Sequence, residues 1–112
     1  MAKVEIVESL FEEINKQFNG KSIEVLQHLQ SLESSPKNGK FLGTVGSIVI
    51  KELKYENFRF YFITDGFKLK CISQEGLVDL LMRFVRMSDK KHQQQTIDEI
   101  KHILRTIGAG GF

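Results

Sequence analysis

An aromatic-rich stretch near the middle of the chain constrains the fold more than any other part of the sequence. Residues 58–64, Phe-Arg-Phe-Tyr-Phe-Ile-Thr, alternate in the manner of a half-buried β-strand. Asp65-Gly66 follows, and this dipeptide favours a two-residue type I′ hairpin turn, because both turn positions need a positive φ. Residues 67–72, Phe-Lys-Leu-Lys-Cys-Ile, are therefore predicted to form the return strand.

A two-residue turn also fixes which residues of the hairpin share a face. The face that carries Phe60, Phe62 and Cys71 is apolar and is predicted to belong to the core. The opposite face is polar, and its side chains should lie together on one surface. They are Arg59, Tyr61, Lys68 and Lys70.

The N-terminal third is predicted to form a strand and a helical hairpin. Residues 2–7 alternate weakly as a strand, and the apolar residues that follow recur with a helical period as far as Asn19-Gly20. Ser22 is expected to cap a second amphipathic helix. Residues 34–39, Ser-Ser-Pro-Lys-Asn-Gly, form a loop by their turn-favouring composition.

The remaining segments complete a sheet and a final helix. Residues 47–53 are rich in β-branched side chains and predict a strand, with a turn at residues 55–57. Residues 77–85 predict the last strand, after which Ser88 or Asp89 would cap an amphipathic helix. The apolar face of that helix carries Ile97, Ile100, Ile103, Leu104 and Ile107.

These elements define a single α+β domain over residues 1–107, with residues 108–112 as a flexible, glycine-rich tail. The sheet is expected to hold three to four mainly antiparallel strands. The N-terminal helical hairpin and the C-terminal helix would cover one face and leave the other face open.

Composition narrows the class of protein. The single cysteine, Cys71, excludes an intrachain disulfide and a metal site built on paired cysteines, and it fits a reducing cytosol. Four glutamates in the first 20 residues do not suit a signal peptide, and no apolar run approaches a membrane span, so a cytoplasmic protein is expected. The net charge is only +2, but the basic excess lies in the second half of the chain. That distribution is expected either of a surface that binds an anionic polymer or of an ordinary solvated surface.

Four short motifs resemble the RelE/HigB group of toxins, including their phage-derived relatives. They are Glu52-Leu53-Lys54, Phe58-Arg59-Phe60-Tyr61-Phe62, Asp65-Gly66 and the run from Arg83 to Lys91. The order of a strand, a helical hairpin, a loop and a sheet is also similar. The chain departs from the group at Lys54, where Arg is usual, at Arg86, where Lys is usual, and in an insertion around residues 71–79.

The resemblance implies a RelE-like fold and a toxin of a toxin–antitoxin pair. Such a toxin is an mRNA interferase: an endoribonuclease that cleaves messenger RNA in the ribosomal A site and so inhibits translation. The reaction would need no metal and no cofactor, because the ribose 2′-hydroxyl attacks the adjacent phosphate. The implied partners are an antitoxin protein and the ribosome with its message. A ParE-like inhibitor of DNA gyrase and a catalytically inactive member that binds RNA or a partner remain as alternatives.

Such a reaction needs a base, an acid and fixed positive charge near the phosphate. The candidate catalytic residues are Lys54, Arg59, Tyr61, Arg83, Arg86, Lys90 and His92, and the candidate RNA-binding residues are Lys68, Lys70 and Lys91. Neighbouring cations would lower the phenol pKa of Tyr61 toward the range of a base, and histidine titrates in a useful range. The alternatives are structural: a sheet aromatic for Tyr61, a helix-start residue for His92, and an ion pair of Arg59 with Glu52 or Glu56.

Overall fold

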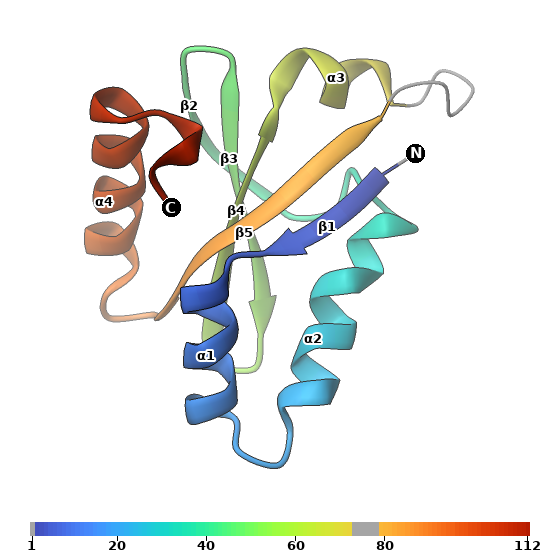
Figure 1. Cartoon of the computed structure of the whole chain (residues 1–112), viewed down its shortest axis with the longest axis vertical. Coiled ribbons are helices and arrows are strands. Elements are labelled where there is room, and N and C mark those ends of the chain that lie inside the picture. Colours follow the sequence, from blue (N-terminus) through green and yellow to red (C-terminus); the bar gives the residue numbers. More distant parts are fainter. Residues whose placement is uncertain (1, 73–78) are drawn as a thin grey trace.

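The computed structural model describes residues 2–72 and 79–112. Within these residues the chain forms a five-stranded mixed sheet and four α-helices (Figure 1). The strands are β1 (Ala2–Ile6), β2 (Lys40–Val45), β3 (Ile48–Tyr55), β4 (Phe58–Asp65) and β5 (Leu80–Asp89). The helices are α1 (Glu8–Gln17), α2 (Ser22–Gln30), α3 (Gly66–Cys71) and α4 (Gln93–Thr106), with short 3₁₀ turns η1 (Ser31–Glu33) and η2 (Ala109–Gly111).

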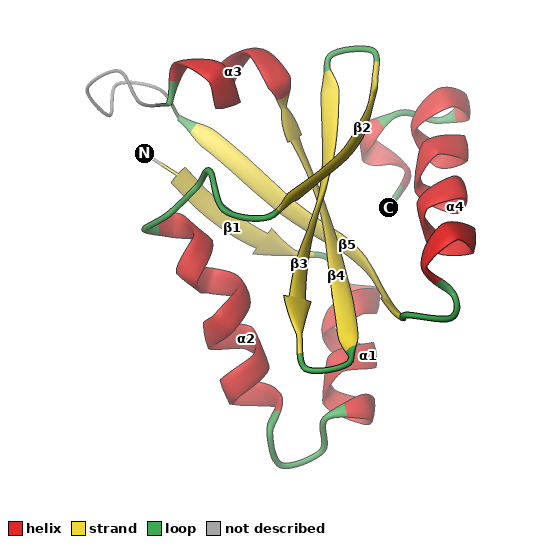
Figure 2. Cartoon of the chain, turned by 180° about the vertical axis from the view of Figure 1, so that it is seen from behind, coloured by secondary structure: helices red, strands yellow, loops and turns green. Residues whose placement is uncertain are grey.

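The strands lie in the order β1-β5-β4-β3-β2, and the sheet is strongly twisted (Figure 2). β1 runs parallel to β5, and the other neighbouring pairs are antiparallel. The α+β class is thus confirmed, with five strands rather than three or four.

Helices cover both faces of the central strand β4, so the prediction of one open face is wrong. The ring of Phe18, at the end of α1, packs edge-on against Phe58, 5.1 Å between ring centroids. Gln93, at the start of α4, donates to Glu52, whose register partner on β4 is Tyr61. Phe58 and Tyr61 point to opposite faces, since side chains alternate along a strand. β4 is therefore buried on both faces, rather than half-buried as its sequence pattern indicated.

The predicted Asp65-Gly66 hairpin is wrong. Asp65 has φ −72° and its side chain accepts a hydrogen bond of 2.9 Å from the Lys68 amide, so that it caps α3. A glycine is needed at position 66 because its backbone lies close to that of Ser47. The Gly66 amide donates to the Ser47 carbonyl at 2.8 Å, and a Cβ would stand 3.0 Å from that oxygen. The return strand over residues 67–72 does not form, and Cys71 ends α3 only partly buried.

Two other strands take the places beside β4. Phe62 pairs in register with Lys51 of β3 on one side and with Phe84 of β5 on the other, not with Leu69. Its ring packs against that of Phe84, 4.9 Å between centroids. The predicted strand over residues 47–53 corresponds to β3, and the predicted turn closes the β3–β4 hairpin at Glu56, whose φ is +52°.

Strand β2 was not anticipated from the sequence. It pairs with β3 through the two-residue turn Gly46-Ser47, where Gly46 has φ +59°. The loop over residues 34–39 leads into β2 and is held by Lys51, whose Nζ donates to the Lys37 carbonyl at 3.0 Å. Burial lowers the pKa of the Lys51 ammonium.

The two ends of the chain follow the predicted order of elements. β1 and the α1–α2 hairpin form as expected, although Lys21 rather than Ser22 precedes α2 and contributes no side-chain cap. β5 begins at Leu80, and the first residues of the predicted last strand lie outside the described chain. α4 buries Ile97, Ile100 and Leu104 but leaves Ile107 exposed. Residues 108–112, expected to be a tail, include the turn η2.

Candidate nucleic-acid interface

The surface predicted for Arg59, Tyr61, Lys68 and Lys70 does not form. Arg59 lies near the start of β4, whereas α3, which carries both lysines, follows the far end of that strand. Eight residues of strand separate these ends by roughly 25 Å at about 3.3 Å per residue. Lys68 and Lys70 are exposed, and they belong to a different part of the molecule from Arg59.

A second set of predicted residues does converge at one end of the sheet. Lys54 and Arg59 are register partners on β3 and β4, and Arg59 is in turn the partner of Ser88 on β5. β5 then ends and leads through an exposed turn into α4, at the lower left of Figure 1. We name this set the cationic cluster. It consists of Lys54, Arg59, Lys90, Lys91 and His92.

The imidazole of His92 is held by a carboxylate. Asp89 Oδ1 lies 2.8 Å from His92 Nδ1 and accepts a further bond of 2.9 Å from the His92 backbone amide. These hydrogen bonds lower the pKa of Asp89, so this carboxylate is the acceptor and Nδ1 carries the hydrogen. No other described residue bonds to Nε2, and the His92 side chain is 56% exposed. A base oriented by a carboxylate with its second nitrogen facing solvent suits proton transfer.

Glu52 connects the two sides of the cluster. Its Oε1 lies 3.6 Å from Arg59 Nε and accepts a 3.2 Å hydrogen bond from Gln93, the residue that follows His92. The side chains of Arg59 and Glu52 are only 11% and 8% exposed. The ion pair considered as the structural alternative for Arg59 is thus present. Glu52 thus fixes this guanidinium at the floor of the cluster and neutralises it in part, over a longer distance than the 2.8 Å and 2.9 Å ion pairs of Arg83 and Arg86.

Tyr61 does not belong to the exposed surface. Its side chain is fully buried, and its hydroxyl lies 2.7 Å from Ser88 Oγ. Burial raises the Tyr61 pKa, and the opposing effects of the Ser88 hydrogen bond and of Arg59 do not reverse this. Arg59 lowers the Tyr61 pKa as predicted, but burial outweighs this effect, so Tyr61 is a buried sheet aromatic rather than a base at the surface.

Arg83 and Arg86 are neutralised by contacts within the chain. Arg83 Nε pairs with Glu5 at 2.8 Å, and its Nη1 donates to the Ala109 carbonyl at 2.9 Å. Arg86 Nε pairs with Glu99 at 2.9 Å, while its guanidinium lies over the ring of Phe112 at 5.1 Å. The segment after α4 therefore covers both arginines. Neither offers a free guanidinium to a phosphate.

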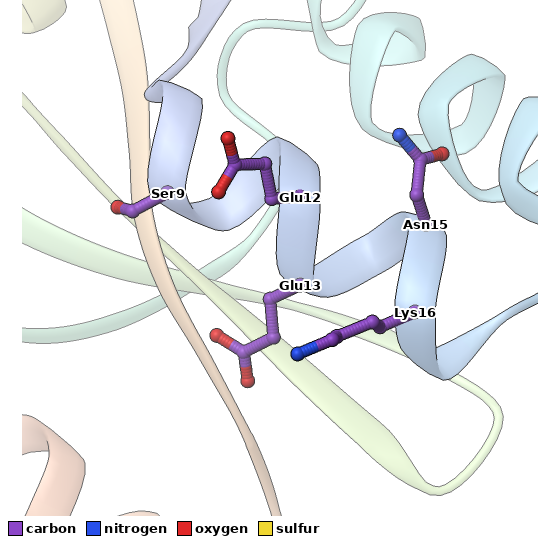
Figure 3. A pocket seen from close by; sticks show the side chains of 5 residues that line it. All are labelled: Ser9, Glu12, Glu13, Asn15 and Lys16. Atoms are coloured by element: carbon purple, nitrogen blue, oxygen red, sulfur yellow. The ribbon is translucent and has the colours of Figure 1, made fainter.

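Several hollows lined by described residues lie outside the cationic cluster, and two of them differ in chemistry. One, of about 290 Å³, has mainly apolar walls that include Ile48, Ile63 and Leu81, with Lys68 among its lining residues. The other, of about 610 Å³, lies along α1 and is shown in Figure 3. Its lining residues are Ser9, Glu12, Glu13, Asn15 and Lys16. Burial raises the Glu13 pKa, although Arg86 opposes the shift. This acidic surface does not suit a polyanion.

Comparison of the chain with protein-family models, curated proteins and solved structures gave no match. Among the described residues there is no group of three or more His, Cys, Asp or Glu side chains that could hold a metal ion. Over the same residues, no helix is long and apolar enough to cross a membrane. Functional inference therefore depends on the geometry of the cationic cluster.

Proposed function

We propose that this protein is an endoribonuclease of the RelE/HigB toxin type that binds RNA at the cationic cluster. The observation that carries the proposal is the Asp89-oriented imidazole of His92 beside four basic side chains at one end of the sheet. A strand, a helical hairpin, antiparallel strands interrupted by α3, and a final helix follow one another in the chain, and this order supports the proposal. An antitoxin protein and the ribosome are the proposed partners.

The proposed chemistry assigns a role to each part of the cluster. His92 Nε2 takes the proton of the ribose 2′-hydroxyl, which attacks the adjacent phosphate and forms a 2′,3′-cyclic phosphate. The bond from phosphorus to the 5′-oxygen of the next nucleotide breaks, and this oxygen takes its proton from water. Arg59, held by Glu52, stabilises the charge of the phosphorane, because a fixed cation needs no reorganisation during the reaction. Lys54, Lys90 and Lys91 bind the flanking phosphates.

A specific observation favours a second candidate, a member that binds RNA without cleaving it. Arg83 and Arg86, which the resemblance places among the catalytic residues, are engaged by Glu5, Glu99 and the C-terminal residues. Tyr61 is buried as well. In this case the cationic cluster would bind a message or a structured RNA and leave it intact.

Primer extension on a defined message during cell-free translation tests both candidates. We expect the wild type to produce cuts that need ribosomes and fall in codon register. Arg59→Ala and His92→Gln should each lower the cleavage rate by about a hundredfold or more, the usual contributions of electrostatic stabilisation and of acid–base catalysis, respectively. His102→Gln, an exposed histidine elsewhere on α4, is the matched control and should cut as the wild type does.

The other outcomes identify the alternatives. An intact message together with RNA binding that Arg59→Ala weakens would favour the non-cleaving member. An intact message without RNA binding would end the RNA proposal, and a DNA gyrase supercoiling assay would then test the ParE-like alternative. Equal cleavage by His92→Gln and by the wild type would remove His92 from the reaction.

A further inference from the structure

Strand β2 forms one edge of the sheet. It pairs with β3 on one side and is the last strand in the sheet order. No backbone hydrogen bond from the described residues reaches its outer side. An edge of six residues offers unpaired amides and carbonyls to another extended chain.

The hairpin geometry shows which backbone groups face outward. Val45 and Ile48 close a two-residue turn and so exchange hydrogen bonds with each other. The next pair, Thr44 and Val49, is then of the non-hydrogen-bonded type, in which the amide and carbonyl of each residue point away from the partner. The Thr44 amide and carbonyl therefore face the free edge, and Thr44 is exposed.

The two faces beside this edge differ in chemistry. Lys40 shares the face of Glu52, its register partner. Lys101 of α4 lies over the same face, since its Cε and Nζ are 3.5 Å from the place of a Cβ on Gly43. On the opposite face Phe41 is 60% exposed. No described residue forms an ion pair with either ammonium group, so one face presents free positive charge and the other an apolar ring.

We propose that the outer edge of β2 binds an extended acidic segment of a partner protein, which adds to the sheet as a sixth strand. Because side chains alternate along a strand, the segment should carry carboxylates toward Lys40 and Lys101 and apolar side chains toward Phe41. The proposal does not depend on RNA cleavage. Pairing of β2 with a second copy of this chain is disfavoured, since it would bring the same cations together.

Titration of the protein with two labelled octapeptides tests the proposal. One peptide alternates Glu and Val, and the other has the same composition with its four Glu residues in one block. We expect the alternating peptide to bind at least about tenfold more tightly in fluorescence anisotropy, because only it satisfies both faces at once. Hydrogen exchange should show that it protects the Thr44 amide.

Two variants at position 44 distinguish binding by strand addition from electrostatic attraction without backbone pairing. Thr44→Pro removes the outward donor, which an edge strand tolerates, and should weaken binding about tenfold or more. Thr44→Val keeps the donor and should bind as the wild type does. The combination of Lys40→Gln and Lys101→Gln should remove the preference for the alternating peptide.

Three results would overturn the proposal. They are equal binding of the two peptides, an unprotected Thr44 amide in the complex, and protection of that amide by a single-stranded RNA instead of by the peptide. Exchange on the wild type decides the matter even if Thr44→Pro does not fold. A nuclease that lacks this peptide site would still cleave RNA, so the two proposals can fail separately.

Discussion

β5 and the turn that follows it carry two groups of basic residues with opposite surroundings. Arg83 and Arg86 lie within the strand, where Glu5, Glu99 and the C-terminal residues contact their guanidinium groups. Lys90 and Lys91 follow the strand in an exposed turn, and no described residue forms an ion pair with them. A strand residue gains partners from the neighbouring strand and from the helix packed on the sheet, whereas a turn residue keeps its hydration. These four cations therefore form two groups. Arg83 and Arg86 are the structural pair, and Lys90 and Lys91 are the charge available to a ligand.

The largest effect should come from the available charge. Lys90→Gln together with Lys91→Gln should lower the slope of log K against log salt by about 1.4, since single-stranded nucleic acid contributes about 0.7 per neutralised phosphate. Affinity for a single-stranded RNA at low salt should fall about tenfold or more. Lys16→Gln with Lys21→Gln, two exposed lysines of the helical hairpin, should leave the slope unchanged. Equal slopes for both double variants would contradict the division into two groups.

The structural pair should respond in stability instead. Arg83→Met with Arg86→Met should lower the free energy of unfolding by about 1–2 kcal/mol, because two partly buried ion pairs and a cation–π contact are lost. Urea denaturation measures this change. The salt slope of RNA binding should stay at the wild-type value. A slope reduced as in the lysine variants would show that these arginines reach the RNA.

A smaller effect concerns the buried hydroxyl of Tyr61. Tyr61→Phe removes the bond to Ser88 and should cost about 1 kcal/mol at neutral pH. Because the Tyr61 pKa is raised, the free energy of unfolding also depends on pH. The folded phenol stays neutral while the unfolded phenol ionises near pH ~10, so this stabilisation is complete below that pH and is lost as the pH rises through the folded-state pKa.

Urea midpoints at pH values on both sides of ~10 check the Tyr61 prediction. The stability of the wild type should fall more steeply with alkaline pH than that of Tyr61→Phe. Cleavage activity should persist in the variant, since a fully buried phenol does not reach a substrate. Loss of activity without loss of stability would restore Tyr61 as a catalytic residue.

The smallest effect should come from Phe112→Ala. Its ring contributes a cation–π contact to Arg86, so the loss in unfolding free energy should be below about 1 kcal/mol. RNA affinity should remain unchanged, because the Glu99 ion pair still holds Arg86. If Phe112→Ala bound RNA clearly more tightly while its melting temperature stayed unchanged, the Phe112 ring rather than Glu99 would be the group that keeps Arg86 from the RNA.

Local patterns were sufficient where an element's own sequence decides its conformation. The apolar residues between positions 8 and 18 recur with a helical period because they lie on the buried side of α1. Asn19-Gly20 ends the helical run, with Gly20 at φ +86°. The Lys54–Arg59 proximity follows from the β3–β4 hairpin, whose turn the sequence predicted at residues 55–57. The second predicted turn, at Asp65-Gly66, does not form, because the same two residues suit a helix N-terminus as well as a hairpin.

The sequence by itself determined an α+β chain with one central aromatic strand, the helical hairpin, the final helix and the run of basic residues after β5. Tertiary structure alone decided which cations are free, since Glu5 and Glu99 are 78 and 13 residues away from the arginines they neutralise. It also decided the neighbours of β4. Long-range pairing and burial depend on contacts between segments distant in sequence, and a local period of hydrophobic residues carries no information about those partners.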